Sequence, residues 1–355
     1  MSFMKISMQM LTTLLLLCSL SILPACAQDI PQFSDRHLQF PKITSKALEE
    51  NLIGDPHVRE MCVLLPPSYF QSTRNRYPVV YYLHGLGMRE DGHRESVGRF
   101  QQLFQLMRDR KLPEMILVAI DGTTSFGGSY YVNSPTIGNF EDYVAREIVA
   151  LVDSSFRTNP GRQWRAIAGF SMGGYGAIKF GMKHSDVFGQ VGSLSGSPLS
   201  IRYRKSIYRK ALAGHSRPAH ILELREKIPF EKNWSLAAAY AKAAALSPNP
   251  RKPQLFLDLP FQSGSDDRDP VWKKWMDEDP LSLVGRYRDE LSSLDQIYID
   301  HGEDETTLGT EDFLRELVRY GIGHTHFIFR GDHTDELFVR HLRMLRFLSA
   351  RWMGE

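Results

Sequence analysis

An uninterrupted run of β-branched and aromatic residues at positions 77–83 restricts the fold of this chain more than any other feature. A strand with one face in solvent alternates apolar and polar residues, so a continuous apolar run indicates a strand buried on both faces. Residues 115–120 repeat the pattern, and further strands are predicted at 59–65, 164–170, 187–194, 297–300 and 326–329. A sheet buried on both faces needs helices on both sides, which predicts an α/β protein with a mostly parallel central sheet.

Segments with apolar residues at helical spacing lie between these strands. They are predicted as helices at about 97–107, 140–152, 172–183, 313–318 and 337–348. The stretch from about 200 to 290 is different, because it carries a basic run, an Ala-rich helix at 236–246 and the pair Trp272 and Trp275. The strand pattern resumes after it. We therefore expect a helical insertion within one domain that covers residues 28–355.

The pattern of residues 1–27 indicates a targeting signal. A lone Lys5 precedes an apolar run at 10–18 that is too short to span a bilayer comfortably, which predicts a secretory signal peptide over residues 1–27. An A-x-A cleavage site before Gln28 would release a soluble protein, periplasmic or secreted. The segment that ends at Cys26 also resembles a lipobox, which would attach a lipid at Cys26 and bring the protein to a membrane. Pro24 is unusual in a lipobox, so we favour soluble export.

Cysteine content and charge exclude several classes of protein. Of 3 Cys, Cys18 and Cys26 lie in the targeting segment, so cleavage before Gln28 leaves Cys62 without an intrachain disulfide partner. Cys62 sits in an apolar strand and is predicted to be a small buried core residue. The formal net charge is only +2, which provides no field to recruit nucleic acid. The spacing of His and Cys offers no metal framework, and no cofactor is expected.

The clearest chemical motif is G-x-S-x-G at Gly169 to Gly173, with a predicted strand before it and a predicted helix after it. In a nucleophile elbow the serine occupies a strained turn, and glycine two residues to either side lets neighbouring backbone pass closely. The context predicts that Ser171 is exposed at the edge of the sheet as a nucleophile. A serine hydroxyl near its free pKa is a poor nucleophile, so it needs a base that a carboxylate orients.

His333 is the predicted base, because it follows the last strand and precedes the last helix. Three other histidines compete with it: His324, His326 and His341. His326 falls in a predicted strand and His341 in a predicted helix, which are positions better suited to packing.

The carboxylate should follow the strand at 297–300. Asp304 is the first choice, Glu305 the second and Asp300 the third, because a loop beyond Gly302 can turn back towards His333 whereas Asp300 ends the strand. The oxyanion of the transition state needs preorganised donors, which we expect from the backbone N–H groups of Met172 and Leu86.

Together these residues resemble the esterase D and feruloyl-esterase-like putative esterases of the α/β-hydrolase superfamily. The matching sequence motifs are YYLHG at 81–85, SYYVNS at 129–134, FEDY at 140–143, RAIAGFSMGGYGA at 165–177, GSLSG at 192–196 and GDH at 331–333. The resemblance implies an α/β-hydrolase fold and a serine ester hydrolase with Ser171, Asp304 and His333 as its triad. The acid loop departs from the usual G-x-x-D, since Glu305 stands at that spacing and Asp304 one residue earlier.

The leading hypothesis is therefore hydrolysis of a small-molecule carboxylic ester through an acyl-serine intermediate. Acyl transfer to another alcohol is an alternative on the same residues. A binding module without catalysis is a further alternative, but it would not need a strained nucleophile turn. We also expect the insertion to form a lid or pocket wall over Ser171, with Trp272 and Trp275 lining the pocket or, alternatively, adding core.

Overall fold

The computed structural model describes residues 32–87, 92–229, 232–262, 268–306 and 308–353. The predicted signal peptide, with Cys18, Cys26 and the cleavage site before Gln28, lies outside the described residues. Residues Phe33–Glu355 form one compact unit.

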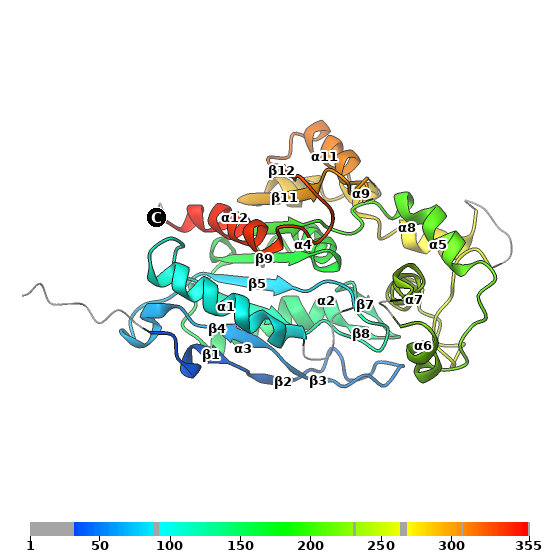
Figure 1. Cartoon of the computed structure of the whole chain (residues 1–355), viewed down its shortest axis with the longest axis horizontal. Coiled ribbons are helices and arrows are strands. Elements are labelled where there is room, and N and C mark those ends of the chain that lie inside the picture. Colours follow the sequence, from blue (N-terminus) through cyan, green and yellow to red (C-terminus); the bar gives the residue numbers. More distant parts are fainter. Residues whose placement is uncertain (1–31, 88–91, 230–231, 263–267, 307, 354–355) are drawn as a thin grey trace, which may run out of the picture. The chain divides into compact units, whose positions relative to one another are not determined.

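The core of the unit is an eight-stranded sheet in the order β1-β4-β6-β5-β9-β10-β11-β12 (Figure 1). Strands β6, β5, β9, β10, β11 and β12 run parallel, and β1 and β4 pair antiparallel at one edge. The bounds are β1 Leu38–Gln39, β4 Cys62–Leu64, β5 Val79–Leu83, β6 Ile116–Ile120, β9 Arg165–Phe170, β10 Gln190–Leu194, β11 Gln296–Gly302 and β12 Thr325–Phe329. The mostly parallel sheet predicted from the buried apolar runs is thus confirmed.

Two short antiparallel pairs accompany the main sheet: β2 (Lys42–Thr44) with β3 (Val58–Glu60), and β7 (Asn133–Ser134) with β8 (Gly138–Asn139). The single strand predicted at 59–65 is therefore wrong in its extent. Its first part belongs to β3 and its second part to β4, which pairs with β1 and β6 in the main sheet. Cys62 in β4 is fully buried, as its apolar neighbours predicted.

Helices cover both faces of the sheet. On one face lie α1 (Gly92–Arg108) and α12 (Leu337–Ala350), whose side chains form a common core with Val80, Leu117 and Ala166. The other face is covered by α4 (Met172–Lys183) and by a helix that runs through α2 (Phe140–Asp142), a π-helical turn and α3 (Val149–Ser155). Val79, Tyr81, Val118 and Ile167 belong to that second core. Neighbouring residues of each strand thus enter opposite cores, which explains why the strands are apolar throughout.

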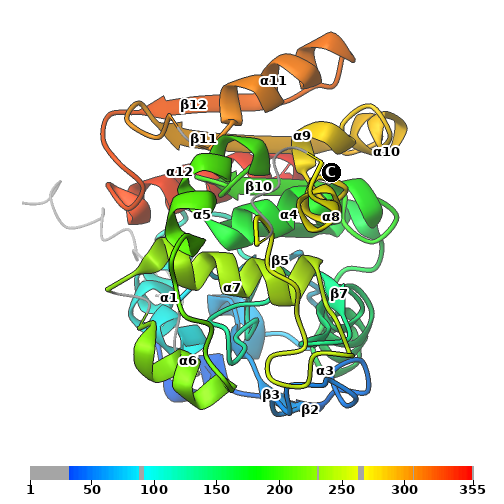
Figure 2. The ribbon, with the colours of Figure 1, turned by 90° about the vertical axis from the view of Figure 1, so that its right-hand side faces the viewer.

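Six α-helices lie between β10 and β11 among the described residues, in the region predicted as an insertion. They are α5 (Lys205–Leu212), α6 (Ile221–Lys227), α7 (Trp234–Leu246), α8 (Pro270–Met276), α9 (Pro280–Leu283) and α10 (Arg288–Ser292). Figure 2 shows α5 to α8 in front of the edge of the sheet at which the parallel strands end. The last connection, between β11 and β12, holds α11 (Thr310–Arg319). No helix among the described residues is both long and apolar enough to cross a membrane.

Candidate active site

Ser171 stands at the turn between β9 and α4 in a backbone conformation that non-glycine residues rarely adopt, with φ of 56°. The turn is crowded on both sides. A Cβ atom at Gly169 would lie 2.4 Å from the carbonyl carbon of Gly173, and one at Gly173 would lie 2.0 Å from the carbonyl oxygen of Leu83. Only glycine permits this approach, which is the steric reason expected from the motif.

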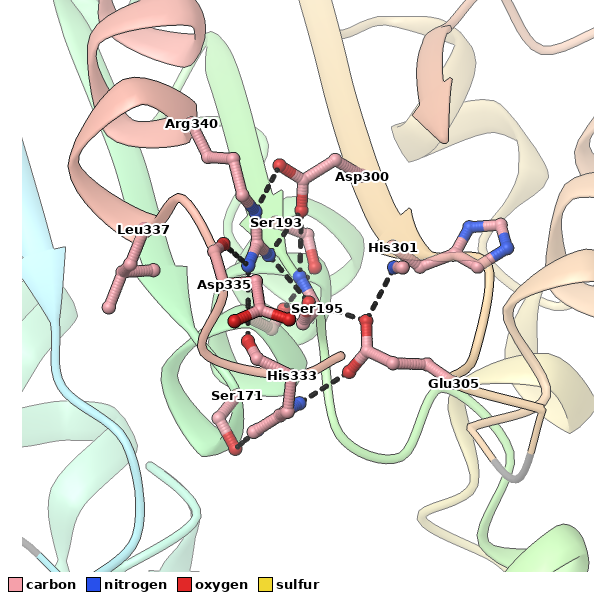
Figure 3. A network of polar contacts seen from close by, with 12 residues as sticks. Ser171, Ser193, Ser195, Asp300, His301, Glu305, His333, Asp335, Leu337 and Arg340 are labelled. Atoms are coloured by element: carbon pink, nitrogen blue, oxygen red, sulfur yellow. Dashed lines mark hydrogen bonds and ion pairs between the residues drawn. The ribbon is translucent and has the colours of Figure 1, made fainter. Parts of the chain in front are cut away.

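The imidazole of His333 connects the serine to a carboxylate (Figure 3). Its Nε2 lies 2.8 Å from the Ser171 hydroxyl oxygen, and its Nδ1 is hydrogen-bonded to the Glu305 carboxylate. The ring also packs against Phe170, with 4.8 Å between the ring centroids. This geometry favours the tautomer in which Nδ1 donates to Glu305 and Nε2 accepts from the serine hydroxyl.

The choice of Asp304 as the partner of His333 is wrong in this structure, which brings Glu305 to the histidine instead. After β11 ends at Gly302 the chain makes a tight turn, with the N–H of Glu305 donating to the carbonyl oxygen of Gly302 at 3.0 Å. The turn directs Glu305 inward, where it is buried, and leaves Asp304 exposed. Asp300, the third choice, lies inside β11 and pairs with Arg340. The spacing G-x-x-E noted in the sequence was the signal for Glu305.

The second carboxylate oxygen of Glu305 is held by protein donors. It accepts hydrogen bonds of 2.7 Å from the Ser195 hydroxyl and of 2.7 Å from the N–H of Gly302. Burial alone would raise the pKa of this carboxyl, but the hydrogen bonds from His333, Gly302 and Ser195 outweigh burial and lower it. Glu305 is therefore an anion that faces the histidine with fixed geometry.

Arg340 of α12, which the sequence analysis did not identify, connects Asp300, Ser195 and His333. Its guanidinium is fully buried and donates to both carboxylate oxygens of Asp300, at 2.9 and 3.1 Å. It also donates to the Ser195 hydroxyl at 2.5 Å and to the carbonyl oxygen of His333 at 3.0 Å. One side chain thus fixes the backbone of His333 and the hydroxyl that orients Glu305 (Figure 3). Its signal in the sequence was an arginine on the apolar face of the last helix.

The competing histidines lie in other surroundings. His326 stacks on His301, with 3.0 Å between His326 Nε2 and His301 Nδ1, and burial together with the charge of His301 lowers the pKa of His326 to about 4. His341 is buried in α12, hydrogen-bonded to the Tyr82 hydroxyl and to the carbonyl oxygen of Leu337. His324 bonds the carbonyl oxygen of Ile322. None of these contacts involves Ser171.

Leu86 and Met172, the predicted donors to an oxyanion, line the same cavity as Ser171. Their side chains are neighbours, because both approach the position that a Cβ of Gly128 would take. Gly85 comes so close to Ser171 that a Cβ there would lie 3.5 Å from the serine Cβ. In the part of the chain that the structure describes, neither N–H donates to a protein acceptor.

The cavity in front of Ser171 has a volume of about 570 Å³. The insertion supplies part of its wall through Arg204, Tyr208, Trp234 and Ala238. Other lining residues come from the end of β9, the start of α4 and the loops after β5, β11 and β12, namely Gly85, Leu86, Phe170, Ser171, Met172, Asp304, Glu305, Leu308, Asp332, His333 and Thr334. A cavity of this size fits a small organic molecule.

Trp272 and Trp275 do not line this cavity, so their assignment to the pocket is wrong and the alternative of added core is right. Both side chains are buried, and the Trp275 indole N–H donates to the Ser247 hydroxyl at 2.9 Å. Trp275 also packs edge-on against Tyr208, with 5.4 Å between the ring centroids. The pair therefore supports the inner side of the insertion, whereas Trp234, which is 46% exposed, is the tryptophan at the cavity.

The fold and the site together define the α/β-hydrolase class: a mostly parallel sheet, a serine at a strained strand-to-helix turn, and a histidine after the last strand. A family model described as putative esterase matches residues 56–335. The chain therefore belongs to the putative esterase family, as its sequence motifs indicated.

Individual relatives agree with this assignment. An esterase of Mycobacterium tuberculosis is 32% identical over 173 residues, which are 47% of this chain and 35% of that protein. The chain thus spans about a third of the length of this curated relative. A solved ferulic acid esterase has a TM-score of 0.60 at 20% identity, with 88% of this chain and 98% of that chain covered. An S-formylglutathione hydrolase from Agrobacterium tumefaciens has a TM-score of 0.55 at 18% identity, covering 88% and 95%. These two structures share the fold.

Proposed function

We propose that this protein is a serine esterase that hydrolyses a small-molecule carboxylic ester through an acyl-serine intermediate on Ser171. The observation that carries the proposal is the continuous hydrogen-bond chain from the Ser171 hydroxyl through His333 to Glu305 at the wall of the cavity. The family and the esterases among its relatives support the same chemistry. The names of the two solved neighbours identify no substrate for this chain.

The reaction follows from the positions of these atoms. As the Ser171 oxygen attacks the ester carbonyl carbon, its proton moves to Nε2 of His333. The resulting imidazolium is stabilised by the Glu305 carboxylate, which remains ionised. The N–H groups of Leu86 and Met172 bind the negative oxygen of the tetrahedral intermediate. His333 then gives its proton to the leaving alcohol, which leaves an acyl group on Ser171.

Deacylation reverses the roles with water as the nucleophile. His333 accepts a proton from the water as it attacks the acyl carbonyl, and then returns this proton to the Ser171 oxygen as the acid is released. Every proton passes through Nε2, so this atom must stay near the serine in both halves of the reaction.

We also propose that the protein is exported. The observation behind this proposal is the apolar segment at 10–18 followed by the small residues before Gln28. The mature amino terminus of the exported protein, read by mass spectrometry, tests it: Gln28 indicates soluble export, a lipidated Cys26 indicates membrane attachment, and an unprocessed Met1 contradicts export.

Labelling with a fluorophosphonate tests the proposed nucleophile. The reagent should modify the protein once, at Ser171, and the Ser171→Ala variant should be neither labelled nor active on an aryl acetate. Ser197→Ala is a matched control, because Ser197 lines the same cavity and, in the described part of the chain, no hydrogen bond joins it to His333, whose Nε2 faces Ser171. Labelling that persists in the Ser171 variant, with loss in the Ser197 variant, would end the proposal.

A further inference from the structure

The wall that the insertion contributes to the cavity carries a guanidinium without an acidic partner among the described residues. Arg204 is the last residue of a short 3₁₀ helix, η5 (Ile201–Arg204), and lines the cavity together with Ser171. Its Nε atom is buried and has no hydrogen-bond partner in the described part of the chain, and its guanidinium carbon lies 4.9 Å from the centroid of the Trp234 ring. Within the described ranges, Arg204 forms no ion pair with any carboxylate. Buried donors are normally paired, so this one requires an explanation.

The backbone around Arg204 is fixed without neutralising its charge. The N–H of Ile201 donates to the Asp279 carboxylate at 2.5 Å, and the N–H of Ser200 donates to the carbonyl oxygen of Leu308 at 2.9 Å. The Tyr203 hydroxyl is hydrogen-bonded to Asp312 of α11. These contacts of Ser200, Ile201 and Tyr203 hold the segment that carries Arg204 at the cavity.

A second basic side chain, Lys242 of α7, interacts electrostatically with Arg204. Lys242 of α7 is fully buried, its Nζ has no hydrogen-bond partner among the described residues, and it lies 3.6 Å from the centroid of the Tyr130 ring, which also lines the cavity. Burial lowers the pKa of Lys242; the positive charge of Arg204 contributes to this decrease, and the negative charge of Asp279 opposes it. Burial raises the pKa of Tyr208 to about 12, against an opposing effect of the Arg204 charge.

The acidic residues of the cavity belong to other segments. Glu305 and Asp304 follow β11, and Asp332 precedes His333 after β12. An anionic group of a bound molecule is therefore repelled by the loops that carry the reacting groups and attracted by the insertion. This polarity orients a substrate that carries both an ester and a negative charge.

We propose that Arg204 binds a carboxylate of the substrate, so that this site prefers esters that carry a free carboxylate over their neutral counterparts. The inference rests on the function proposed above and specifies its substrate class. A guanidinium matches a carboxylate in a paired, two-bond geometry. A single carboxylate fits better than a dianionic phosphate, because Arg204 is the sole arginine or lysine among the cavity-lining residues of the described chain.

Matched ester pairs test the inference and distinguish the two places where the carboxylate can lie. In the acyl arm, the para-nitrophenyl monoester of glutaric acid is compared with its methyl ester. In the alcohol arm, para-acetoxybenzoate is compared with methyl para-acetoxybenzoate. Each pair gives a ratio of kcat/KM, charged over neutral, for the full chain and for three variants: Arg204→Gln, Arg204→Lys and Arg202→Gln. Arg202 is an exposed arginine of the same 3₁₀ helix that does not line the cavity.

In at least one arm, Arg204→Gln should lower the ratio by roughly ten- to a hundredfold, mainly through KM, since it removes a charge-assisted hydrogen bond. Arg204→Lys should retain part of the ratio, and Arg202→Gln should keep it within about twofold. Fluorophosphonate labelling of Ser171 in each variant reports that the site has folded.

A ratio that Arg204→Gln leaves unchanged in both arms, in a variant that is labelled and hydrolyses the neutral ester, overturns this inference and leaves the esterase proposal standing. An equal fall in the Arg202 variant also overturns it, because that result indicates a general effect of surface charge. Absence of both labelling and hydrolysis in the unmodified chain refutes the proposed function, and this inference with it.

Discussion

Replacement of Arg340 by Met is the most informative single change, because Arg340 is the one fully buried arginine described here. Its guanidinium donates to the carbonyl oxygen of His333 and to the Ser195 hydroxyl, which in turn donates to Glu305. Methionine preserves much of the apolar volume and removes the charge. Asp300 would then remain in the core of the sheet without its counterion. Burial already raises the pKa of Asp300, and the hydrogen bonds and charge of Arg340 counter this increase.

The expected loss follows from the contacts. Removing one partner of a buried ion pair typically destabilises a protein by about 3–5 kcal/mol, because the other charge stays buried and unpaired. Arg340 also satisfies the carbonyl oxygens of His333 and Asp335 and the Ser195 hydroxyl, so a value near the upper end is expected. Against a total stability of about 5–15 kcal/mol, such a loss is large.

Urea unfolding at pH 7, followed by tryptophan fluorescence, measures this loss. Arg346→Met on the same helix is the control, since Arg346 is exposed and should change the free energy of unfolding by less than about 0.5 kcal/mol. In the double variant with Asp300→Asn the losses should not add, because the second change removes the charge that the first leaves unpaired. A loss below about 1 kcal/mol for Arg340→Met, or strict additivity, would refute the reasoning.

Three further changes test other parts of the structure. Glu305→Gln should lower kcat by roughly 10⁴ by favouring the wrong tautomer of His333, while Asp304→Asn stays within several-fold; a reversed order would return the role to Asp304. Trp275→Ala should cost about 3–5 kcal/mol and leave the ranking of ester substrates unchanged, and an altered ranking would contradict its place in the core. Burial lowers the pKa of His341 to about 3, so its contribution to stability is lost as the pH falls from about 6.5 towards 3, at up to about 1.4 kcal/mol per pH unit. His341→Gln should flatten this decline in acid unfolding curves, and an unchanged slope would exclude His341 as its source.

Much of the architecture could be predicted because local patterns determine it. The helix predicted at 172–183 is α4 with the same bounds. A tight glycine turn begins this helix, so local sequence determines where it starts. The buried strands were evident because two cores, one on each face, require apolar residues at successive positions. The extent of the strand predicted at 59–65 was wrong, because a run of apolar residues does not indicate where the chain changes from one pairing partner to another.

The sequence pattern alone could not identify the carboxylate that contacts His333. Asp304 and Glu305 are adjacent and chemically similar, and the tight turn after Gly302 decides which of them faces His333. The tryptophan pair posed a similar problem, because an aromatic residue in an insertion can line a cavity or fill a core. Only the packing of Trp275 against Tyr208 and Ser247 separates these possibilities. Arg340 joins segments that are distant in the sequence, and no local spacing indicates such a link.

The residues that hold the catalytic groups in place differ from the residues that we expect to select the substrate. Ser195, Gly302 and Arg340, which hold Glu305 and His333, belong to the sheet and to the helix that packs on it. Arg204 and Trp234 belong to the insertion, and their contacts described above do not include Ser171, His333 or Glu305. Changes at Arg204 and Trp234 should therefore act on KM and on the ranking of esters, whereas changes in the Arg340 network should act on kcat and on stability. The proposed reaction and the proposed substrate preference thus depend on different parts of this chain.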